Sequence, residues 1–316
     1  MKNVSNINNI VIVGAGLMGV SLAQIFAGEG YRVSIYDISE AGIEKGKNLL
    51  DLNQRVAVEE QEISQELSDK LKSQIDFTVQ MDIFQEADYV IEAIVENMEV
   101  KKKFWAKASE MVNDDVVLTT NTSGLSITEI AKAVKKPERF AGMHWVNPPH
   151  LVPLVEVIKG DQTDIETLKI IEALAIAVRK KPVRVKKDAP GFVLNRLQYA
   201  LLREALHIVE NDMADCEDVD NVMKYGLGMR YACIGPFETV DLGGLDTFYK
   251  VSSYLFAELS DEKEVPNLMR KLYEEGSYGT KTGKGFYEYT EQEVNEVIEK
   301  RDRQFTKLGK LLFNDL

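Results

Sequence analysis

Short apolar runs alternate with longer segments of helical spacing through the first 185 residues. Short runs rich in β-branched residues predict buried strands, and they lie at 9–13, 31–36, 89–94, 116–119, 140–143, 154–158 and 183–185. Between most of them, apolar residues recur every three or four positions, which predicts helices that include 100–111, 127–134 and 165–178. Strands that alternate with helices are typical of a parallel sheet covered on both faces. We therefore predict an α/β fold with a Rossmann-like, doubly wound, mainly parallel sheet.

The pattern changes near residue 188. From 192 to 256 the apolar spacing is helical and few strand-like runs remain. We predict an α/β domain at 1–187 with a helical insertion at about 39–73, an all-α domain at 188–290 and a charged helical tail at 291–316. The helical half is apolar enough to form a subunit interface.

Charge and composition exclude several kinds of partner. The formal net charge is −13, which argues against nucleic acid and anionic membranes. No apolar run approaches the roughly 20 residues of a membrane span, and the polar N-terminus lacks the core of a signal peptide. The two cysteines have no ligand-spaced partners, so we expect no metal and a reducing compartment. These features predict a cytoplasmic protein that acts on a small molecule.

A glycine-rich run follows the first predicted strand. It consists of Gly14, Ala15, Gly16, Leu17, Met18 and Gly19. Glycines at this spacing allow a tight turn and close approach of a pyrophosphate to a helix N-terminus. Asp37 ends the next strand, where a carboxylate accepts ribose hydrogen bonds and repels a 2′-phosphate. The run and Asp37 predict a site for NAD rather than NADP.

The segment 142–158 contains the strongest catalytic candidates. His144 follows the strand at 140–143, and Glu156 lies inside the apolar run 154–158. A buried carboxylate is costly unless it is paired, and a neighbouring imidazole is suited to proton removal near neutral pH. The pair predicts that Glu156 orients His144 as a general base for a hydroxyl proton. The alternative is an exposed glutamate and an unrelated histidine.

Four further polar residues stand at predicted strand ends or helix starts: Glu96, Lys101, Ser123 and Asn195. Each also has an ordinary structural explanation. Glu96 and Lys101 would serve equally as surface charges, and Ser123 and Asn195 as helix caps. The residue pattern alone leaves their roles open.

Together these motifs resemble the L-3-hydroxyacyl-CoA dehydrogenase family over about residues 9–289. The matching runs are 13–19, 92–97, 121–123, 142–144, 154–158, 190–196, 235–238 and 281–286. The resemblance implies His144 as base with Glu156 as its partner, and Ser123 and Asn195 as catalytic, substrate-binding polar groups. The NAD-contacting positions that it implies are Gly14, Gly16, Gly19, Asp37, Glu96, Lys101, Asn147 and Lys281. It also implies a role in fatty acid metabolism and a homodimer formed through the C-terminal domain.

Two departures concern the substrate. Asn53 and Glu60 stand where the acyl-CoA enzymes have a CoA-contacting serine and lysine, and a glutamate is a poor neighbour for a phosphate. The run 226–236 is closer to relatives that oxidise free 3-hydroxy acids, gulonate 3-dehydrogenase and carnitine 3-dehydrogenase. Its Arg230 would bind a substrate carboxylate or form a structural ion pair. By contrast, 243–246 and 281–286 look like the hydroxybutyryl-CoA enzymes.

The sequence therefore predicts NAD-dependent oxidation of a short L-3-hydroxyacyl-CoA, such as 3-hydroxybutyryl-CoA, to the 3-keto product. A dehydrogenase of a free 3-hydroxy acid is the main alternative. An NAD-binding structural protein without turnover is the third.

Overall fold

The chain divides into two compact units, the first ending at Asn195 and the second beginning at Arg196. The computed structural model describes residues 4–61 and 63–313. Each unit is considered by itself below. The sequence placed its domain boundary at 187/188, a few residues before the division between the compact units.

The first unit is built on an eight-stranded sheet. Its strands are β1 Asn9–Val13, β2 Arg32–Tyr36, β3 Ile75–Thr78, β4 Tyr89–Glu92, β5 Val117–Thr120, β6 Phe140–Trp145, β7 Leu154–Ile158 and β8 Lys181–Val185. The strand order is β3-β2-β1-β4-β5-β6-β7-β8. Neighbours are parallel except β6 and β7, which are antiparallel. The predicted doubly wound, mainly parallel sheet is confirmed, although the short β3 was not among the predicted strands.

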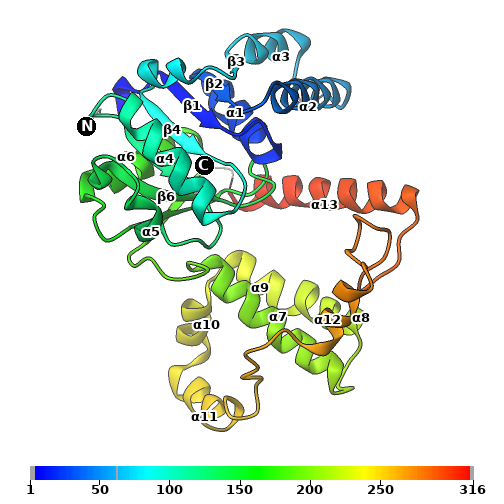
Figure 1. The fold of residues 1–316 in the computed structure, drawn as a ribbon. Helices are drawn as coiled ribbons and strands as arrows, with labels where there is room; N and C mark the ends of the chain where they lie inside the picture. Colours follow the sequence, from blue (N-terminus) through cyan, green and yellow to red (C-terminus); the bar gives the residue numbers. More distant parts are fainter. Residues whose placement is uncertain (1–3, 62, 314–316) are drawn as a thin grey trace. The chain divides into compact units, whose positions relative to one another are not determined.

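Helices cover both faces of the sheet, as Figure 1 shows. They are α1 Leu17–Gly28, α2 Glu40–Glu59, α3 Gln65–Lys72, α4 Met98–Met111, α5 Ile127–Ala131 and α6 Ile165–Ala177, with 3-10 turns η1 Val4–Asn6, η2 Met81–Glu86 and η3 Pro137–Arg139. Side chains of β1 alternate between two buried clusters: Ile10 and Ile12 enter one, and Val11 and Val13 the other. α1 and α6 supply the first cluster, and α4 and α5 the second. The helices α2 and α3 lie within the segment 39–73, for which the sequence predicted a helical insertion.

The topology places the switch point of the sheet and the pair formed by His144 and Glu156 at the same edge. The strand order reverses between β1 and β4, and ligands of such sheets bind beyond the carboxyl ends of the strands at this switch point. Because β7 runs antiparallel to β6, the amino end of β7 lies at that same edge, and His144 pairs in register with Glu156. The expectation that His144 follows its strand is wrong. β6 continues through Trp145 because the strand pairing with β7 extends that far.

The second unit is helical, as the sequence predicted. α7 Leu194–Glu210 leads into it, followed by α8 Cys216–Val222, the π-helical turn η4 Met223–Leu227, α9 Gly228–Cys233, α10 Pro236–Gly243, α11 Leu245–Leu255, α12 Asn267–Glu274 and α13 Glu291–Leu312. Among its described residues, only Leu206 and Thr239 are buried. This unit therefore has very little core of its own. Within 4–61 and 63–313, no helix combines the length and apolar character needed to cross a membrane.

Candidate active site

The three glycines after β1 have different surroundings. A Cβ on Gly14, whose φ is +106°, would lie 2.7 Å from the carbonyl oxygen of Ala93, and one on Gly19 would lie 1.9 Å from that of Gly14. A Cβ on Gly16 would meet nothing within 4 Å. Gly14 and Gly19 are therefore required by packing, whereas Gly16 borders open space at the uncapped N-terminus of α1. This is the arrangement that a pyrophosphate needs.

The two residues between Gly16 and Gly19 differ in exposure. The side chain of Leu17 is 56% exposed, whereas Met18 packs against the buried cluster that contains Ile10. Leu17 is thus free to border a ligand at the first turn of α1, and Met18 contributes mainly to the core.

Asp37 joins the end of β2 to the glycine-rich run. One carboxylate oxygen, Oδ2, accepts a hydrogen bond from the amide of Ala15 at 3.0 Å, and Oδ1 accepts from the amide of Ser39 at 3.1 Å. Each carboxylate oxygen can accept more than one hydrogen bond, so acceptor capacity remains for ribose hydroxyls. A negative charge beside the N-terminus of α1 fits NAD and would repel a 2′-phosphate.

A fully buried carboxylate, Glu92, organises the loop after β4. Its Oε1 accepts hydrogen bonds from the amide of Ile94 and from Lys101 Nζ, and its Oε2 accepts from Trp105 Nε1 and Thr120 Oγ1. Lys101, only 1% exposed, is therefore a buried partner of Glu92 and no surface charge. This ion pair was not expected from the sequence, because only the fold brings these residues together.

Glu96 extends this network towards the two residues that were predicted to bind substrate. Lys101 Nζ lies 3.4 Å from Glu96 Oε2, and Glu96 Oε1 accepts hydrogen bonds from Thr122 Oγ1 at 2.5 Å and from the amide of Ser123 at 2.9 Å. The carbonyl of Ser123 then accepts a hydrogen bond from Asn195 Nδ2 at 2.8 Å. Glu96, Lys101, Ser123 and Asn195 are thus joined in one chain of contacts.

His144 and Glu156 form the expected pair. His144 Nδ1 lies 2.8 Å from Glu156 Oε2, and both side chains are buried. Glu156 Oε1 accepts hydrogen bonds from the amides of Val193 and Leu194, both at 2.9 Å. Burial acts to raise the pKa of Glu156, but hydrogen bonds from His144 and the two amides outweigh it, so the pKa lies below 4.5. With Nδ1–H donated to this carboxylate, Nε2 is left as a proton acceptor.

Phe192 is a site residue to which the sequence assigned no role. Its buried ring lies 5.7 Å from the His144 ring, centroid to centroid. Its φ of +49° is a left-handed conformation, which costs a non-glycine residue roughly 1–2 kcal/mol. The bend immediately precedes the two amides that bind Glu156, so it shapes both the packing of His144 and the binding of its partner. The Pro190-Gly191 pair before an aromatic residue was the available signal.

Three predicted contact residues remain apart from these networks. Asn147 is exposed in the loop after β6, where the Asn147–Pro148 peptide is cis. Arg230 in α9 and Lys281 lie in the second unit, and both are exposed. Their relation to the dyad stays a prediction.

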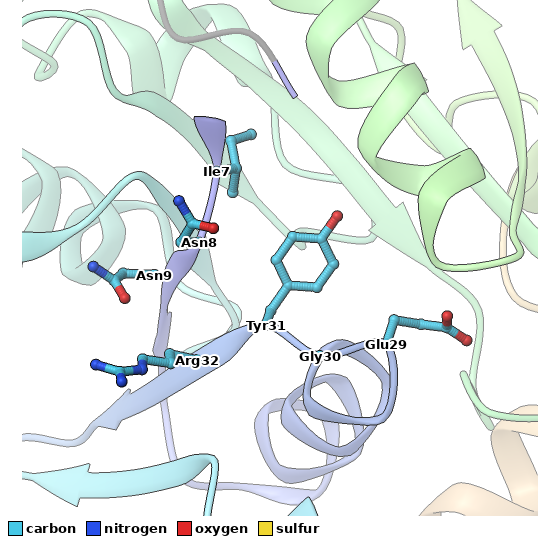
Figure 2. A pocket seen from close by; sticks show the side chains of 7 residues that line it. All are labelled: Ile7, Asn8, Asn9, Glu29, Gly30, Tyr31 and Arg32. Atoms are coloured by element: carbon cyan, nitrogen blue, oxygen red, sulfur yellow. The ribbon is translucent and has the colours of Figure 1, made fainter. Parts of the chain in front are cut away.

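A surface hollow at the opposite edge of the sheet is unrelated to this site. Its lining residues are Ile7, Asn8, Asn9, Glu29, Gly30, Tyr31 and Arg32. They lie at the amino ends of β1 and β2, away from the glycine-rich run. Figure 2 shows that Tyr31 and Arg32 point in different directions, so they do not converge on one ligand. Among residues 4–61 and 63–313, no cluster of three or more His, Cys, Asp or Glu side chains could hold a metal ion.

Family comparisons agree with the geometry of the site. The model for the NAD-binding domain of 3-hydroxyacyl-CoA dehydrogenase matches residues 9–189, and the model for the C-terminal domain of that enzyme matches 191–289. The chain belongs to the 3-hydroxyacyl-CoA dehydrogenase family. Members are NAD-dependent oxidoreductases, so the predicted cofactor and enzyme class are confirmed. The alternative of a structural protein without turnover loses its support.

Relatives with about the same sequence identity to this chain are named for different substrates. The 5-formyl-3-hydroxy-2-methylpyridine 4-carboxylate 5-dehydrogenase of Mesorhizobium japonicum is 36% identical over 97% of this chain and 98% of its own. A solved structure of a 5-dehydrogenase for this pyridine acid, described as an NAD+-dependent dismutase, has a TM-score of 0.88 at 35% identity and covers 97% of this chain and 98% of its own. The (S)-3-hydroxybutyryl-CoA dehydrogenase of Ralstonia eutropha has a TM-score of 0.75 at 35% identity, covering 90% of this chain and 100% of its own.

The glycine geometry predicts two distinct effects of alanine. In Gly16→Ala the fold has room for the methyl group, so the melting temperature stays unchanged while the Kd for NAD rises at least about tenfold, or 1.4 kcal/mol. In Gly19→Ala the methyl group overlaps the Gly14 carbonyl, so the free energy of unfolding falls by about 1–3 kcal/mol or more. Calorimetric titration and thermal melting measure both. Unchanged NAD affinity in Gly16→Ala would contradict the assignment of the pyrophosphate site.

Proposed function

We propose that this chain oxidises the hydroxyl group of a 3-hydroxy substrate to a ketone, with His144 as general base and Glu156 as its orienting partner. The main support for this proposal is the 2.8 Å contact between His144 Nδ1 and Glu156 Oε2. NAD, when bound, accepts the hydride from the carbon that bears the hydroxyl. His144 Nε2 takes the hydroxyl proton, and Glu156 stabilises the imidazolium that results.

The polar residues around Ser123 suit the developing carbonyl. Ser123 is exposed at the carboxyl end of β5, and its backbone is fixed by Glu96 on one side and Asn195 on the other. A donor that is already oriented stabilises developing charge without reorganisation during the reaction. We assign Ser123 and Asn195 to hold the substrate oxygens.

His144→Gln tests the base. Glutamine keeps a polar side chain of similar length but cannot accept the proton, so kcat falls by about 10²–10⁴-fold. The Kd for NAD remains near the wild-type value, because the glycine-rich run is unaltered. His207→Gln in α7 is the matched control and retains activity. Near-wild-type turnover in His144→Gln would refute the assignment.

The first substrate candidate is a short L-3-hydroxyacyl-CoA, in fatty acid metabolism. Its support is the set of relatives named 3-hydroxybutyryl-CoA dehydrogenase, among them those of Deinococcus radiodurans and Bacillus subtilis at 36% and 37% identity. They cover 88% and 90% of this chain. The C-terminal family model ends at residue 289, before α13 begins.

The second candidate, a free 3-hydroxy acid, has two observations in its favour, and we prefer it. The pyridine 4-carboxylate dehydrogenase matches 307 residues of this chain of 316 and therefore includes most of the 22-residue α13. Its name describes a free carboxylate in place of a CoA thioester, although the position that it names for dehydrogenation, carbon 5, carries a formyl group. In addition, Glu60 is exposed at the end of α2, in the insertion where the CoA enzymes have lysine-rich sequence. A carboxylate there opposes binding of a CoA phosphate.

A substrate panel with an arginine variant separates the candidates. We expect kcat/KM to be higher for a free acid, among 3-hydroxybutyrate, gulonate and carnitine, than for 3-hydroxybutyryl-CoA. Arg230→Met removes the charge that we propose for the substrate carboxylate, so we expect kcat/KM for the free acid to fall by roughly 10–100-fold, equivalent to about 1.5–3 kcal/mol. Arg270→Met, in α12 of the same unit, is the control and leaves that value unchanged. A clear preference for the CoA ester, unaffected by Arg230→Met, would restore the first candidate.

We also propose that two copies of the chain associate through the second unit. Large apolar side chains are exposed there, including Tyr225, Met229, Phe237, Leu242 and Tyr249, each at least 74%. Soluble monomers rarely expose extensive apolar surface without a partner. Burying these side chains against a second copy would supply the core that the unit lacks. The cytoplasmic location stays a prediction.

Sedimentation velocity at micromolar concentration tests this association. We expect a species of twice the 35.6 kDa chain mass. A protein that remains monomeric and fully active under the same conditions would contradict a dimer built on this surface.

A further inference from the structure

Lys180 is a buried cation with no part in the chemistry described above. It lies between α6 and β8 and is 7% exposed. Its Nζ donates hydrogen bonds to two carbonyl oxygens, that of Pro149 at 2.6 Å and that of Val152 at 3.1 Å. Both acceptors belong to the loop 146–153 that joins β6 to β7.

This loop connects the two catalytic candidates. It starts two residues after His144 and ends three residues before Glu156, and it carries Asn147. The amides of Leu151 and Val152 bind the carbonyl of Pro148 at 3.1 and 3.0 Å, which closes a compact turn. That turn is local, so it cannot fix the orientation of the loop against the sheet.

Contacts with the start of β8 provide that orientation. The amide of Lys181 binds the carbonyl of Pro153 at 2.8 Å, and the Lys180 ammonium binds two carbonyls farther into the loop. Lys180 is itself fixed, because its amide binds the carbonyl of Ala175 near the end of α6. The loop is therefore attached to β8 through the backbone amide of Lys181, and its central part is attached through the Lys180 side chain.

We propose that Lys180 is a positioning residue that clamps the loop 146–153 and so holds Asn147 in the geometry for NAD binding. The inference rests on the proposed role of Asn147 as an NAD contact. Its effect is exerted on the loop and involves no contact with substrate.

The charged groups on the surrounding elements are engaged elsewhere or exposed. Arg179 Nε lies 3.0 Å from Glu29, Arg184 binds Glu172, and Glu156 is held by His144 and the start of α7. The other charged or titratable groups on these elements are Glu166, Lys169, Lys181 and His150, all exposed. Burial alone accounts for the pKa of Lys180, which it lowers from 10.5 to about 8.

This titration gives stability and NAD binding opposite dependences on pH. Between about pH 8 and 10.5 the unfolded chain holds a proton on Lys180 that the folded chain has lost, so this residue's contribution to the free energy of unfolding rises with pH. Over the same range the clamp loses its charge, and its hydrogen bonds weaken to roughly half their strength. NAD binding should therefore weaken where stability increases.

Lys180→Met tests the clamp, because methionine fills similar space without a donor. We expect the Kd for NAD at pH 7, measured by titration calorimetry, to rise about tenfold, as loss of a charge-assisted hydrogen bond implies. The wild-type Kd rises from pH 7 to 9, whereas that of the variant is flat. The melting temperature at pH 7 is unchanged or higher, because a buried cation has been replaced by an apolar chain. Lys181→Met, at the exposed neighbouring position, behaves as wild type.

Two outcomes would overturn the proposal. One is wild-type NAD affinity and pH dependence in Lys180→Met, and the other is a lower melting temperature with NAD affinity intact, which indicates a merely structural role. If the methionine variant does not fold, Lys180→Gln keeps an N–H donor group without the charge and should also raise the Kd for NAD. A wild-type Kd that is flat from pH 7 to 9 also rejects the clamp. These readouts use NAD binding and the melting temperature, so they are independent of the turnover by which His144→Gln tests the base.

Discussion

The active-site region depends on one buried carboxylate, that of Glu156. It joins a histidine on β6 to the amides of Val193, just before α7, and of Leu194, the first residue of α7, and itself lies on β7. Burying a charge is unfavourable unless hydrogen bonds replace water. Here they come from two other segments of the chain, so folding those segments against β7 and keeping Glu156 ionised are the same requirement. The low pKa of this carboxylate expresses that coupling.

The same principle recurs across the ligand edge of the sheet. Glu92 is satisfied by two side chains of α4, one of β5 and a backbone amide of its own loop. Lys180 is satisfied by carbonyls of the loop that follows β6. Each buried charge thus fixes a connecting segment that packing alone would leave less defined. Polar contacts therefore stabilise the loops at the ligand edge of the sheet, whereas apolar contacts stabilise the sheet itself.

Much of this arrangement could be predicted from residue patterns. The sheet, the glycine-rich run and Asp37 follow from local periodicity and spacing, and Glu156 was conspicuous because a charge interrupts an apolar strand. The residues that were missed act over distance. Lys101 reads as a surface charge until the fold brings it to Glu92, and Phe192 gains its role only from a left-handed backbone beside His144. β3 was missed because only two of its four residues are apolar.

Glu156 also complicates how loss of activity would be interpreted. Leu194, whose amide it binds, is the first residue of α7, the helix that runs on into the second unit. Removing the carboxylate therefore disturbs both the tautomer of His144, the proposed base, and the attachment of the first turn of α7. A variant at this position would lose activity for two reasons, the altered protonation of His144 and the weaker attachment of α7. The two would be separable only by comparing it with changes at His144, where the helix anchor is left in place.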